Sequence, residues 1–584
     1  IVKLINSKGS DEEVISLLKP ISASGNIEDW LSKLLSGMQN TMKDIAENAC
    51  DENLEDMELR TFVDKYPAQF ALLGMQVNWT LQCTEALEKC RTSKNVMQDN
   101  NKEQLSVLTE LSSWTLGDLG TKMNRKKIET LITIQVHQRD VFADLTRLYK
   151  ERKVSSANDF EWLKQARFYF YPDTASDKLG EGAITISICD VDFNYNHEYL
   201  GCKERLVITP LTDRAYITLS QALGMCLGGA PAGPAGTGKT ETVKDLGRAL
   251  GLYVVVTNCT DNHSYLDMAK IFKGLCQAGL WGCFDEFNRI RLPTLSVVAQ
   301  QVLAITNAKR TSQTTFAFPG DASNIEMDPI VGYFITMNPG YQGRQELPEN
   351  LKVLFRSVAM MVPDREIIIR VKLCAVGYSR FSELAKKFRV LYRLCEEQLS
   401  KQRHYDFGLR NILSVLRTAG KVKRDNVDKD EALLMMGTLR DMNLSKMVSQ
   451  DTPLFLSLLA DLFPGMEPPA GSAGGRELKD AIETTVNKNG FIMHPPWLQK
   501  VQQLYDTYLV RHGIMLVGPA GGGKSAIIST LSKSLSNIKG FPFKIVSMNP
   551  KAINADEMFG ETDQLSGEWM DGVFAMMWSK FNQR

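Results

Sequence analysis

One phosphate-binding signature, G-x-x-x-x-G-K-[ST], occurs twice in this chain. The copies are Gly233-Pro234-Ala235-Gly236-Thr237-Gly238-Lys239-Thr240 and Gly518-Pro519-Ala520-Gly521-Gly522-Gly523-Lys524-Ser525. In such a loop the glycines let backbone N–H groups close around phosphate oxygens, while the lysine neutralises their charge and the last hydroxyl reaches Mg²⁺. We therefore expect two tandem modules that bind nucleoside triphosphate. Glu241 and Ala526, which follow the two loops, are included among the expected nucleotide-binding residues.

Composition excludes several other classes of protein. The 584 residues carry 68 basic and 68 acidic side chains, without the basic excess that is typical of non-specific nucleic-acid binders. No apolar run is long enough for a transmembrane helix, so we expect neither a nucleic-acid nor a membrane partner. The 11 cysteines form no C-x-x-C pair, which favours free thiols in a reducing compartment. The chain begins at Ile1 without a signal peptide, and we expect it to be a piece of a longer protein.

The pattern of apolar residues divides the chain into four expected domains. Residues 1–180 repeat apolar side chains at helical spacing, as in Trp30–Leu35, and predict a bundle of long helices. Residues 181–364 are expected to form a large α/β subdomain, and residues 365–465 a helical lid. Residues 466–584, which open on a turn-rich linker, are expected to be the truncated start of a second module.

Alternating strand and helix signals predict a parallel sheet with helices on both faces. The expected strands are Ala183–Ile188, Arg205–Thr209, Leu252–Val256, Gly332–Met337 and, before the second loop, Ile514–Val517. The expected helices of the first module include residues 265–279 and 293–308, and residues 524–537 should follow the second loop. The predicted fold class is α/β plus α.

A phosphate loop alone indicates binding, and hydrolysis needs carboxylates as well. The apolar run Leu280–Phe284 ends in Asp285-Glu286, the Walker B pattern. Asp285 would hold the metal, and Glu286 would polarise the attacking water. Thr240 is the direct Mg²⁺ ligand candidate and Ser525 its counterpart in the second loop. An isolated acidic pair would more commonly cap a helix or lie on the surface.

Three further polar residues are candidates for the first site. Asn338 ends the expected strand Gly332–Met337, where it could contact the γ-phosphate or the lytic water, although Asn-Pro is also a common turn. Arg410 lies in the helical lid and could reach back to the γ-phosphate. Arg356 lies where a ring ATPase projects an arginine finger. For either arginine a surface salt bridge is the alternative.

The second site is less complete than the first. No apolar strand ending in Asp-Glu follows Ser525 before the chain ends. The pair Asp556-Glu557 lies in a polar stretch and is expected to be loop. The residues present leave open whether this site hydrolyses nucleotide.

These motifs resemble the motor region of a dynein heavy chain over essentially the whole chain. Gly233–Thr242 with Cys283–Arg289 is similar to the first AAA+ module of that family, and Asn549–Ile553 is similar to its second. Leu206–Arg214 resembles the segment that enters the first module, whose backbone packs on adenine, here at Val207 and Ile208. Tyr66–Phe70 and Asn78–Thr80 resemble the C-terminal part of the linker. The amino-acid sequence of these segments resembles axonemal heavy chains more than cytoplasmic ones.

The resemblance implies a minus-end-directed microtubule motor built as a ring of six AAA+ modules, with ATP or ADP and Mg²⁺ as ligands. The first module would be the main hydrolytic site, the linker would bend across the ring, and the second module would hold nucleotide without turning it over. Implied partners are the remaining AAA+ modules, other dynein chains and, through a region outside this segment, microtubules. The implied location is the cytoskeleton, in the axoneme of a cilium or flagellum. The sequence departs from the family at Ser357, because relatives usually have proline directly after the pair that is Phe355-Arg356 here.

Because the finger that completes the first site would lie beyond residue 584, we expect the isolated segment to bind ATP, hydrolyse it slowly and not bind microtubules. Two alternatives stay open at the level of sequence. A nucleotide-gated scaffold would bind ATP structurally, and substitution of Glu286 would then change little. A midasin-like remodelling ATPase also carries tandem modules, but the linker-like helices and Leu206–Arg214 argue against it.

Overall fold

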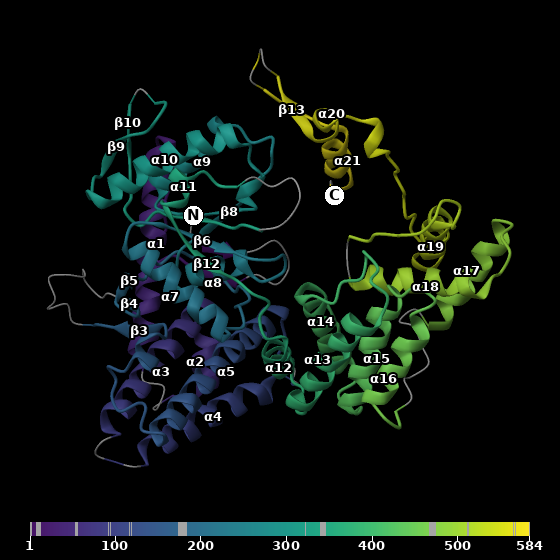
Figure 1. The fold of residues 1–584 in the computed structure, drawn as a ribbon, viewed down its shortest axis with the longest axis horizontal. Coiled ribbons are helices and arrows are strands. Elements are labelled where there is room, and N and C mark those ends of the chain that lie inside the picture. Colours follow the sequence, from purple (N-terminus) through teal and green to yellow (C-terminus); the bar gives the residue numbers. More distant parts are fainter. Residues whose placement is uncertain are drawn as a thin grey trace. The chain divides into compact units, whose positions relative to one another are not determined.

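The computed structural model describes residues 3–6, 13–52, 57–90, 93, 95–115, 117, 119–172, 184–321, 323–338, 346–466, 475–510, 513–563, 566 and 568–582 (Figure 1). The chain forms two compact units. Unit 1 comprises Ile1–Thr438 and Val448–Met466, and unit 2 comprises Leu439–Met447 and Glu467–Arg584. Within the described ranges no helix combines the length and the apolar character needed to cross a membrane.

The N-terminal part of unit 1 is a helical bundle, as the sequence predicts. Its helices are α1 (Ile27–Asp51), α2 (Leu59–Lys65), α3 (Ala68–Lys89), α4 (Val96–Trp114), α5 (Lys122–Lys150) and α6 (Phe160–Leu163). Helix α3 follows Pro67 and buries side chains around most of its circumference, because it packs against α1, α4 and α5. Helix α5 begins at the cap residue Thr121, whose hydroxyl accepts a hydrogen bond from the Asn124 N–H at 3.2 Å.

Five short strands accompany these helices, and most of them lack a clear sequence signal. Strands β1 (Lys3–Asn6) and β2 (Glu13–Ser16) form an antiparallel pair. Strands β3 (Arg167–Phe170), β4 (Ile184–Ile188) and β5 (Val191–Asn194) form an antiparallel sheet that crosses the expected boundary at residue 180. Only β4 was predicted as a strand, and that prediction is confirmed.

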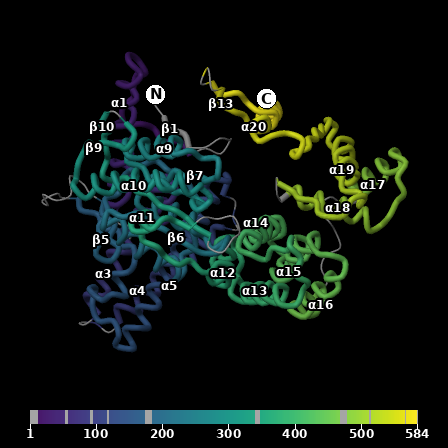
Figure 2. Tube along the Cα trace, turned by 45° about the horizontal axis from the view of Figure 1, so that its top comes forward, coloured from purple at the N-terminus to yellow at the C-terminus, as the bar shows by residue number. Residues whose placement is uncertain are grey.

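A five-stranded parallel sheet forms the centre of the first module, and its strands β6 (Gly228–Ala232) and β7 (Val254–Asn258) are labelled in Figure 2. Its strands are β6 (Gly228–Ala232), β7 (Val254–Asn258), β8 (Trp281–Asp285), β11 (Gly332–Ile335) and β12 (Phe355–Ala359), in the order β12-β6-β11-β8-β7. The connecting helices include α7 (Pro210–Gly224), α8 (Lys239–Ala249), α9 (Tyr265–Ala278) and α10 (Leu292–Arg310). The predictions of helices at 265–279 and 293–308 and of strands near 252–256 and 332–337 are confirmed, with shifted ends.

Helices cover both faces of this sheet because its strands alternate side chains between two cores. Trp281, Cys283 and Phe334 belong to the core that includes residues of α7 and α8, whereas Phe284 and Tyr333 belong to the core that includes α9 and α10. The small elements β9 (Thr315–Ala317), β10 (Asn324–Glu326), the 3-10 helix η1 (Phe287–Arg289) and α11 (Glu349–Lys352) complete this part.

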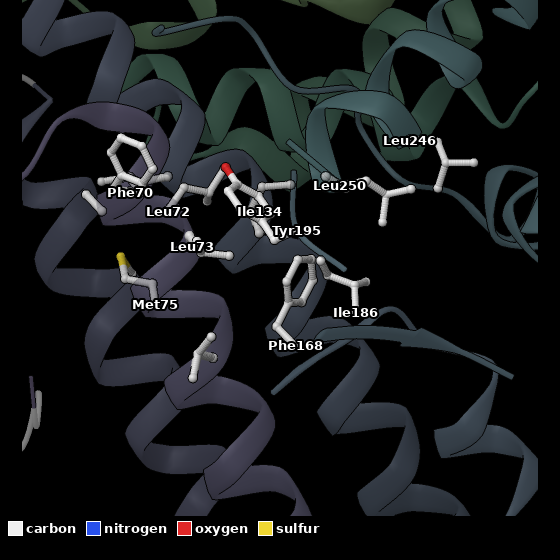
Figure 3. Close-up of a cluster of buried hydrophobic side chains, with 14 of the residues drawn as sticks. Phe70, Leu72, Leu73, Met75, Ile134, Phe168, Ile186, Tyr195, Leu246 and Leu250 are labelled. Carbon is white, nitrogen blue, oxygen red and sulfur yellow. The ribbon is translucent and has the colours of Figure 1, made fainter. Parts of the chain in front are cut away.

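The first core continues into the helical bundle. Figure 3 shows Phe70 and Leu73 of α3, Ile134 of α5, Phe168 of β3 and Leu246 of α8 in one cluster of buried side chains. Because side chains of the bundle and of the phosphate-binding helix α8 belong to this cluster, the two share one hydrophobic core. Burial of apolar surface stabilises such a core by about 25 cal/mol per Å².

The expected strand at Arg205–Thr209 is wrong. They pair with no strand in the part of the chain that the structure describes, and the Leu206 N–H instead donates to the side chain of Asp245 at 3.0 Å. Thr209 then caps α7 in a reciprocal capping box with Thr212. The β-branched side chains of this segment are buried or half-buried beside α7 and α8. Side chains also satisfy backbone groups of this segment that a neighbouring strand would otherwise pair.

Five helices follow the sheet, as predicted for the lid. They are α12 (Arg365–Val376), α13 (Phe381–Gln398), α14 (Leu409–Asp425), α15 (Glu431–Leu444) and α16 (Thr452–Leu462). Local signals set their ends. Asp364 accepts a hydrogen bond from the Glu366 N–H at 2.9 Å at the start of α12, and Gly377 ends it with φ 95°.

Unit 2 contains α17 (Gly475–Lys488), α18 (Pro495–Val510), α19 (Lys524–Lys539), the 3-10 helix η2 (Pro550–Ala552), α20 (Ala555–Phe559), β13 (Gly560–Thr562), β14 (Trp569–Asp571) and α21 (Val573–Asn582). Helix α19 confirms the predicted helix after the second loop. Helices α17 and α18 pack against it around Ile482, Val501 and Leu531. Of the expected linker at 467–475, residues 467–474 lie outside the described residues, and Gly475 begins α17.

Two expectations for unit 2 are wrong. Ile514–Val517 was expected to be a strand, but it has no strand pairing among the described residues, and Met515 is 84% exposed. An apolar, β-branched run forms a strand only where a neighbouring strand pairs with its backbone. Asp556-Glu557 was expected to be loop, but it forms the first turn of α20, where the Glu557 carboxylate accepts a hydrogen bond from the Asn554 N–H at 3.2 Å.

Candidate nucleotide-binding site

The first phosphate loop connects β6 to α8 and is fixed to neighbouring strands of the sheet. The Gly233 N–H donates to the carbonyl of Met337 at 3.1 Å, and a Cβ on Gly233 would lie 2.0 Å from the carbonyl oxygen of Met360. Gly236 and Gly238 adopt φ 77° and 84°, a region that favours glycine. The loop thus needs glycine for close packing at one end and for backbone conformation at the other.

Lys239 is the first residue of α8 and is 7% exposed. Its Nζ donates to the carbonyl oxygens of Gly233 and Pro234 at 2.9 and 2.7 Å, which holds the ammonium group inside the loop. Thr240, half-buried, follows it in the first turn of α8. Helix N-termini favour anions, so the loop, the ammonium group and the helix end together form a cradle for phosphate.

Asp285 and Glu286 lie at the end of β8, next to β11, whose last residue is followed by Thr336 and, two residues later, Asn338. The Thr336 hydroxyl donates to Asp285 Oδ1. The Glu286 N–H contacts both Asp285 Oδ1 and Thr336 Oγ1, each at 3.1 Å. Glu286 itself has φ 53°, an unusual conformation for a residue with a side chain, and such positions cluster at functional sites.

Both carboxylate oxygens of Glu286 have partners. Asn338 Nδ2 donates to Glu286 Oε1 at 3.1 Å, and Arg289 Nε lies 2.5 Å from Glu286 Oε2. Asn338 is buried, whereas Arg289 is exposed. The predicted sensor asparagine and the predicted catalytic glutamate are therefore in direct contact.

The arrangement of strands brings the loop and these side chains to one edge of the sheet. Strand β11 lies between β6 and β8, and all three are parallel. Their carboxyl ends meet at the same edge, where open α/β sheets bind ligands. The donor set fits Mg²⁺, which prefers oxygen ligands, because Thr240 offers a hydroxyl and Asp285 a carboxylate. Bound there, the ion would neutralise phosphate charge.

The two candidate arginines lie on other elements, β12 and α14. Arg356 lies on β12, where its Nη1 is 3.7 Å from Met225 Sδ. Arg410 is exposed in the first turn of α14. Among the described residues, no hydrogen bond or ion pair joins either arginine to Asp285 or Glu286. Their expected roles stay predictions.

The residues expected to face adenine lie beside α7 and α8. Val207 is buried in the core that contains Tyr216 of α7 and Val243 of α8, and Ile208 is half-buried against the same core. The segment that carries them is anchored to α8 through Asp245.

Sequence reasoning missed three contributors to the site region. Thr336, which holds Asp285, could have been found, since residues two apart on a strand point the same way and Asn338 was already a candidate. Arg289 lies three residues after Glu286, a spacing at which ion pairs are common. Asp245, buried under the connecting segment, had no local sequence signal.

The second loop repeats the backbone geometry of the first with less burial. Gly521 and Gly523 adopt φ 78° and 76°, and Lys524 Nζ donates to the carbonyls of Gly518 and Pro519 at 2.9 and 2.6 Å. Ser525 is exposed and Ala526 half-buried. A Cβ on Gly518 would meet no atom within 4 Å.

Comparison with known proteins agrees with this geometry. Residues 195–525 match the family described as the hydrolytic ATP binding site of dynein motor region. The chain is 55% identical over 568 residues to the dynein gamma chain of the flagellar outer arm of Chlamydomonas reinhardtii, covering 97% of this chain and 12% of that protein. It is 53% identical over 579 residues to dynein axonemal heavy chain 5 of Rattus norvegicus, covering 99% of this chain and 16% of the relative.

A third relative, dynein axonemal heavy chain 8 of Mus musculus, is 52% identical over 569 residues, which cover 97% of this chain and 12% of that protein. The chain thus spans less than one fifth of the length of these relatives. The first loop, Asp285, Glu286 and Asn338 all lie within the matched family region. The chain belongs to the dynein heavy-chain family and contains the hydrolytic ATP-binding site of its motor region.

Proposed function

We propose that the first module hydrolyses ATP with Mg²⁺ and that the chain is a segment of an axonemal microtubule motor. The observation that carries the hydrolytic proposal is the contact of Asn338 with Glu286 at 3.1 Å, beside Asp285 and at the same sheet edge as the loop. A binding scaffold needs the loop but has no need for a buried amide that orients a carboxylate.

Each residue of the cluster has a distinct task in this proposal. Lys239 neutralises charge on the β- and γ-phosphates, and Thr240 and Asp285 hold Mg²⁺. Glu286 polarises the attacking water, and Asn338 orients that carboxylate or the water itself. Arg410 would approach the γ-phosphate from the lid, a role inferred from its position in the sequence.

The second module is proposed to hold nucleotide in a structural or regulatory way. Its loop has the same pattern of glycine conformations and lysine contacts as the first. The nearest acidic pair in sequence, Asp556-Glu557, lies in α20, where Glu557 caps the helix. The similarity of the loops supports binding, and the resemblance of Asn549–Ile553 to the family's second module supports a role other than turnover.

The motor proposal rests on the relatives. Two of them are named as flagellar outer arm and axonemal dyneins, which supports a location in the axoneme. In the complete motor, ATP turnover would drive movement of the helical linker represented here by α1–α6. The remaining AAA+ modules, other dynein chains and, through a region outside this segment, microtubules would be its partners.

Substitution of Glu286 by Gln tests hydrolysis. In the full heavy chain we expect Glu286→Gln to lower microtubule-stimulated ATP turnover at least ~100-fold, because the amide cannot act as a general base. Retention of ATP would persist, since Lys239 and the loop are unchanged. The readouts are steady-state phosphate release and nucleotide retained after rapid filtration.

The matched control is Glu557→Gln, which makes the same chemical change at a carboxylate that caps α20. This control should leave turnover near the wild-type value. Wild-type turnover in Glu286→Gln would instead favour a nucleotide-gated scaffold over an ATPase.

A further inference from the structure

A buried ion pair outside the carboxylate cluster joins α8 to the segment that leads into α7. Arg205 Nε and Nη2 donate to Asp245 Oδ1 and Oδ2 at 2.8 and 3.1 Å, and the two side chains are 6% and 0% exposed. The same carboxylate accepts the Leu206 N–H at 3.0 Å and the Tyr216 hydroxyl at 2.7 Å. Four hydrogen bonds therefore fix this carboxylate in one orientation.

The position of this pair connects the two ends of the proposed nucleotide site. Asp245 lies on α8, whose first residue is Lys239 of the phosphate loop. Leu206, whose backbone N–H donates to Asp245, directly precedes Val207 and Ile208, the residues that the family resemblance leads us to expect at the base. Asp245 thus sets the distance between the part of the site that binds phosphate and the part that would bind the base.

The residues before Arg205 are anchored in the same way. Gln69 of α3 donates to the Tyr195 hydroxyl at 2.7 Å and to the Glu198 carbonyl at 2.8 Å, and it accepts the Leu200 N–H at 2.8 Å. The Glu198 N–H donates to the carbonyl of Gly251, just after α8, at 3.1 Å. Figure 3 shows Tyr195 within the shared cluster of buried side chains. Side chains of the bundle and of α8 therefore hold this segment from both sides.

Stability alone is a weak explanation for the pair. Removing two charges from water costs several kcal/mol per ion, and apolar replacements of buried pairs are often neutral or stabilising. A fully hydrogen-bonded pair instead specifies a unique geometry. The geometry specified here is the placement of Leu206 against α8.

We propose that Asp245 and Arg205 are positioning residues that hold the Leu206–Ile208 segment at the base of the bound nucleotide, so that the site prefers ATP to a bare triphosphate. This inference rests on the proposed function of the first site. Tyr216 assists by donating to the same carboxylate.

Photolabelling resolved by peptide tests this proposal in the full heavy chain, because it reports the first site separately from other nucleotide sites. The protein is labelled with 8-azido-ATP and Mg²⁺, and labelling of the peptide that contains Val207 and Ile208 is competed with ATP or with inorganic tripolyphosphate. The measured quantity is the ratio of the two half-maximal competitor concentrations.

We expect Asp245→Asn to reduce the preference for ATP roughly tenfold, since small displacements of positioning groups have large effects. Tyr216→Phe should shift the ratio less, in the same direction, and it decides the question if Asp245→Asn does not fold. The matched control is Glu431→Gln, which breaks another buried ion pair, with Lys423 at 3.2 Å, and should leave the ratio unchanged.

Two results would overturn the inference, and they are distinguishable. If wild-type protein shows ATP-protected labelling but the ratio is the same in Asp245→Asn and Tyr216→Phe, the positioning role alone is wrong. If wild-type protein shows no ATP-protected labelling of this peptide, the proposed nucleotide site is itself wrong.

Discussion

Single residues distinguish the two phosphate loops more sharply than their shared motif does. A Cβ on Gly233 would lie against the backbone of Met360, whereas in this 584-residue segment a Cβ on the equivalent Gly518 would meet no atom within 4 Å. The motif specifies glycine at both positions, but only the structure shows that the first is required by a neighbouring backbone. A motif match therefore predicts the conformation of a loop better than it predicts what the loop packs against.

Replacement of the first glycine of each loop should have unequal effects. Gly233→Ala places a Cβ 2.0 Å from the Met360 carbonyl oxygen, so the loop must shift, and we expect ATP turnover by the full heavy chain to fall at least ~100-fold. In the 584-residue segment, a Cβ at Gly518 meets no atom within 4 Å, so Gly518→Ala should retain nucleotide binding at the second loop of that segment. Phosphate release and peptide-resolved labelling measure the two outcomes. Equal tolerance of both substitutions would contradict this account.

At the scale of elements, sequence periodicity predicted helices well and strands less reliably. Apolar spacing is a local property, so α9, α10 and α19 could be placed closely. A strand also needs a partner, which local sequence does not specify. Arg205–Thr209 and Ile514–Val517 both have strand composition, yet the first is bonded to Asp245 and the second has no strand pairing among the described residues. The same reasoning explains why the short strand β3 was missed.

The contact of α5 with α12, which joins the bundle to the lid helices, combines an ion pair with an apolar core. Arg370 Nη2 lies 2.7 Å from Asp140 Oδ2, and both side chains are about one-third exposed. Ile368, on the same helix as Arg370, is buried in the shared core. Exposed pairs are worth about 0–1 kcal/mol, whereas truncating a buried isoleucine to alanine costs about 2–5 kcal/mol.

We therefore expect Arg370→Ala to change the local opening free energy of α12 by less than about 1 kcal/mol. Ile368→Ala should lower it by about 2–5 kcal/mol, because the cavity remains after the side chain is removed. Hydrogen exchange of the α12 amides measures both values. A larger effect of Arg370→Ala than of Ile368→Ala would show that the ion pair, rather than the apolar core, holds the helix.

For the whole molecule, the sequence predicted the candidate site better than it predicted the contacts that join the helical bundle to the first module. The loop, Asp285, Glu286 and Asn338 follow from motifs whose spacing places them at one sheet edge. The network of Gln69, Arg205 and Asp245 links parts far apart in sequence, so no local pattern signals it. Domain boundaries drawn from composition likewise do not reveal that the bundle and the phosphate-binding helix share one core.

Two histidines in this shared region should make the stability of unit 1 sensitive to acid. The pKa of His137 is lowered to about 4, mainly by loss of solvation and to a smaller extent by the charge of Arg205. The pKa of His197 is also lowered to about 4, mainly by loss of solvation and to a smaller extent by the charge of Lys43. The unfolded chain binds more protons between pH 6.5 and 4, so unfolding becomes easier as the pH falls through this window. The contribution is fully present above pH 6.5, and each histidine accounts for at most about 3 kcal/mol.

His197→Asn should flatten this dependence, because asparagine does not titrate and tolerates the left-handed backbone found there, with φ 53°. The control is His404→Asn, which replaces an exposed histidine of the same unit. Urea unfolding at a series of pH values between 4 and 7 measures the slope. If His197→Asn keeps the wild-type slope while His404→Asn reduces it, His197 does not contribute to the acid sensitivity and an exposed histidine does.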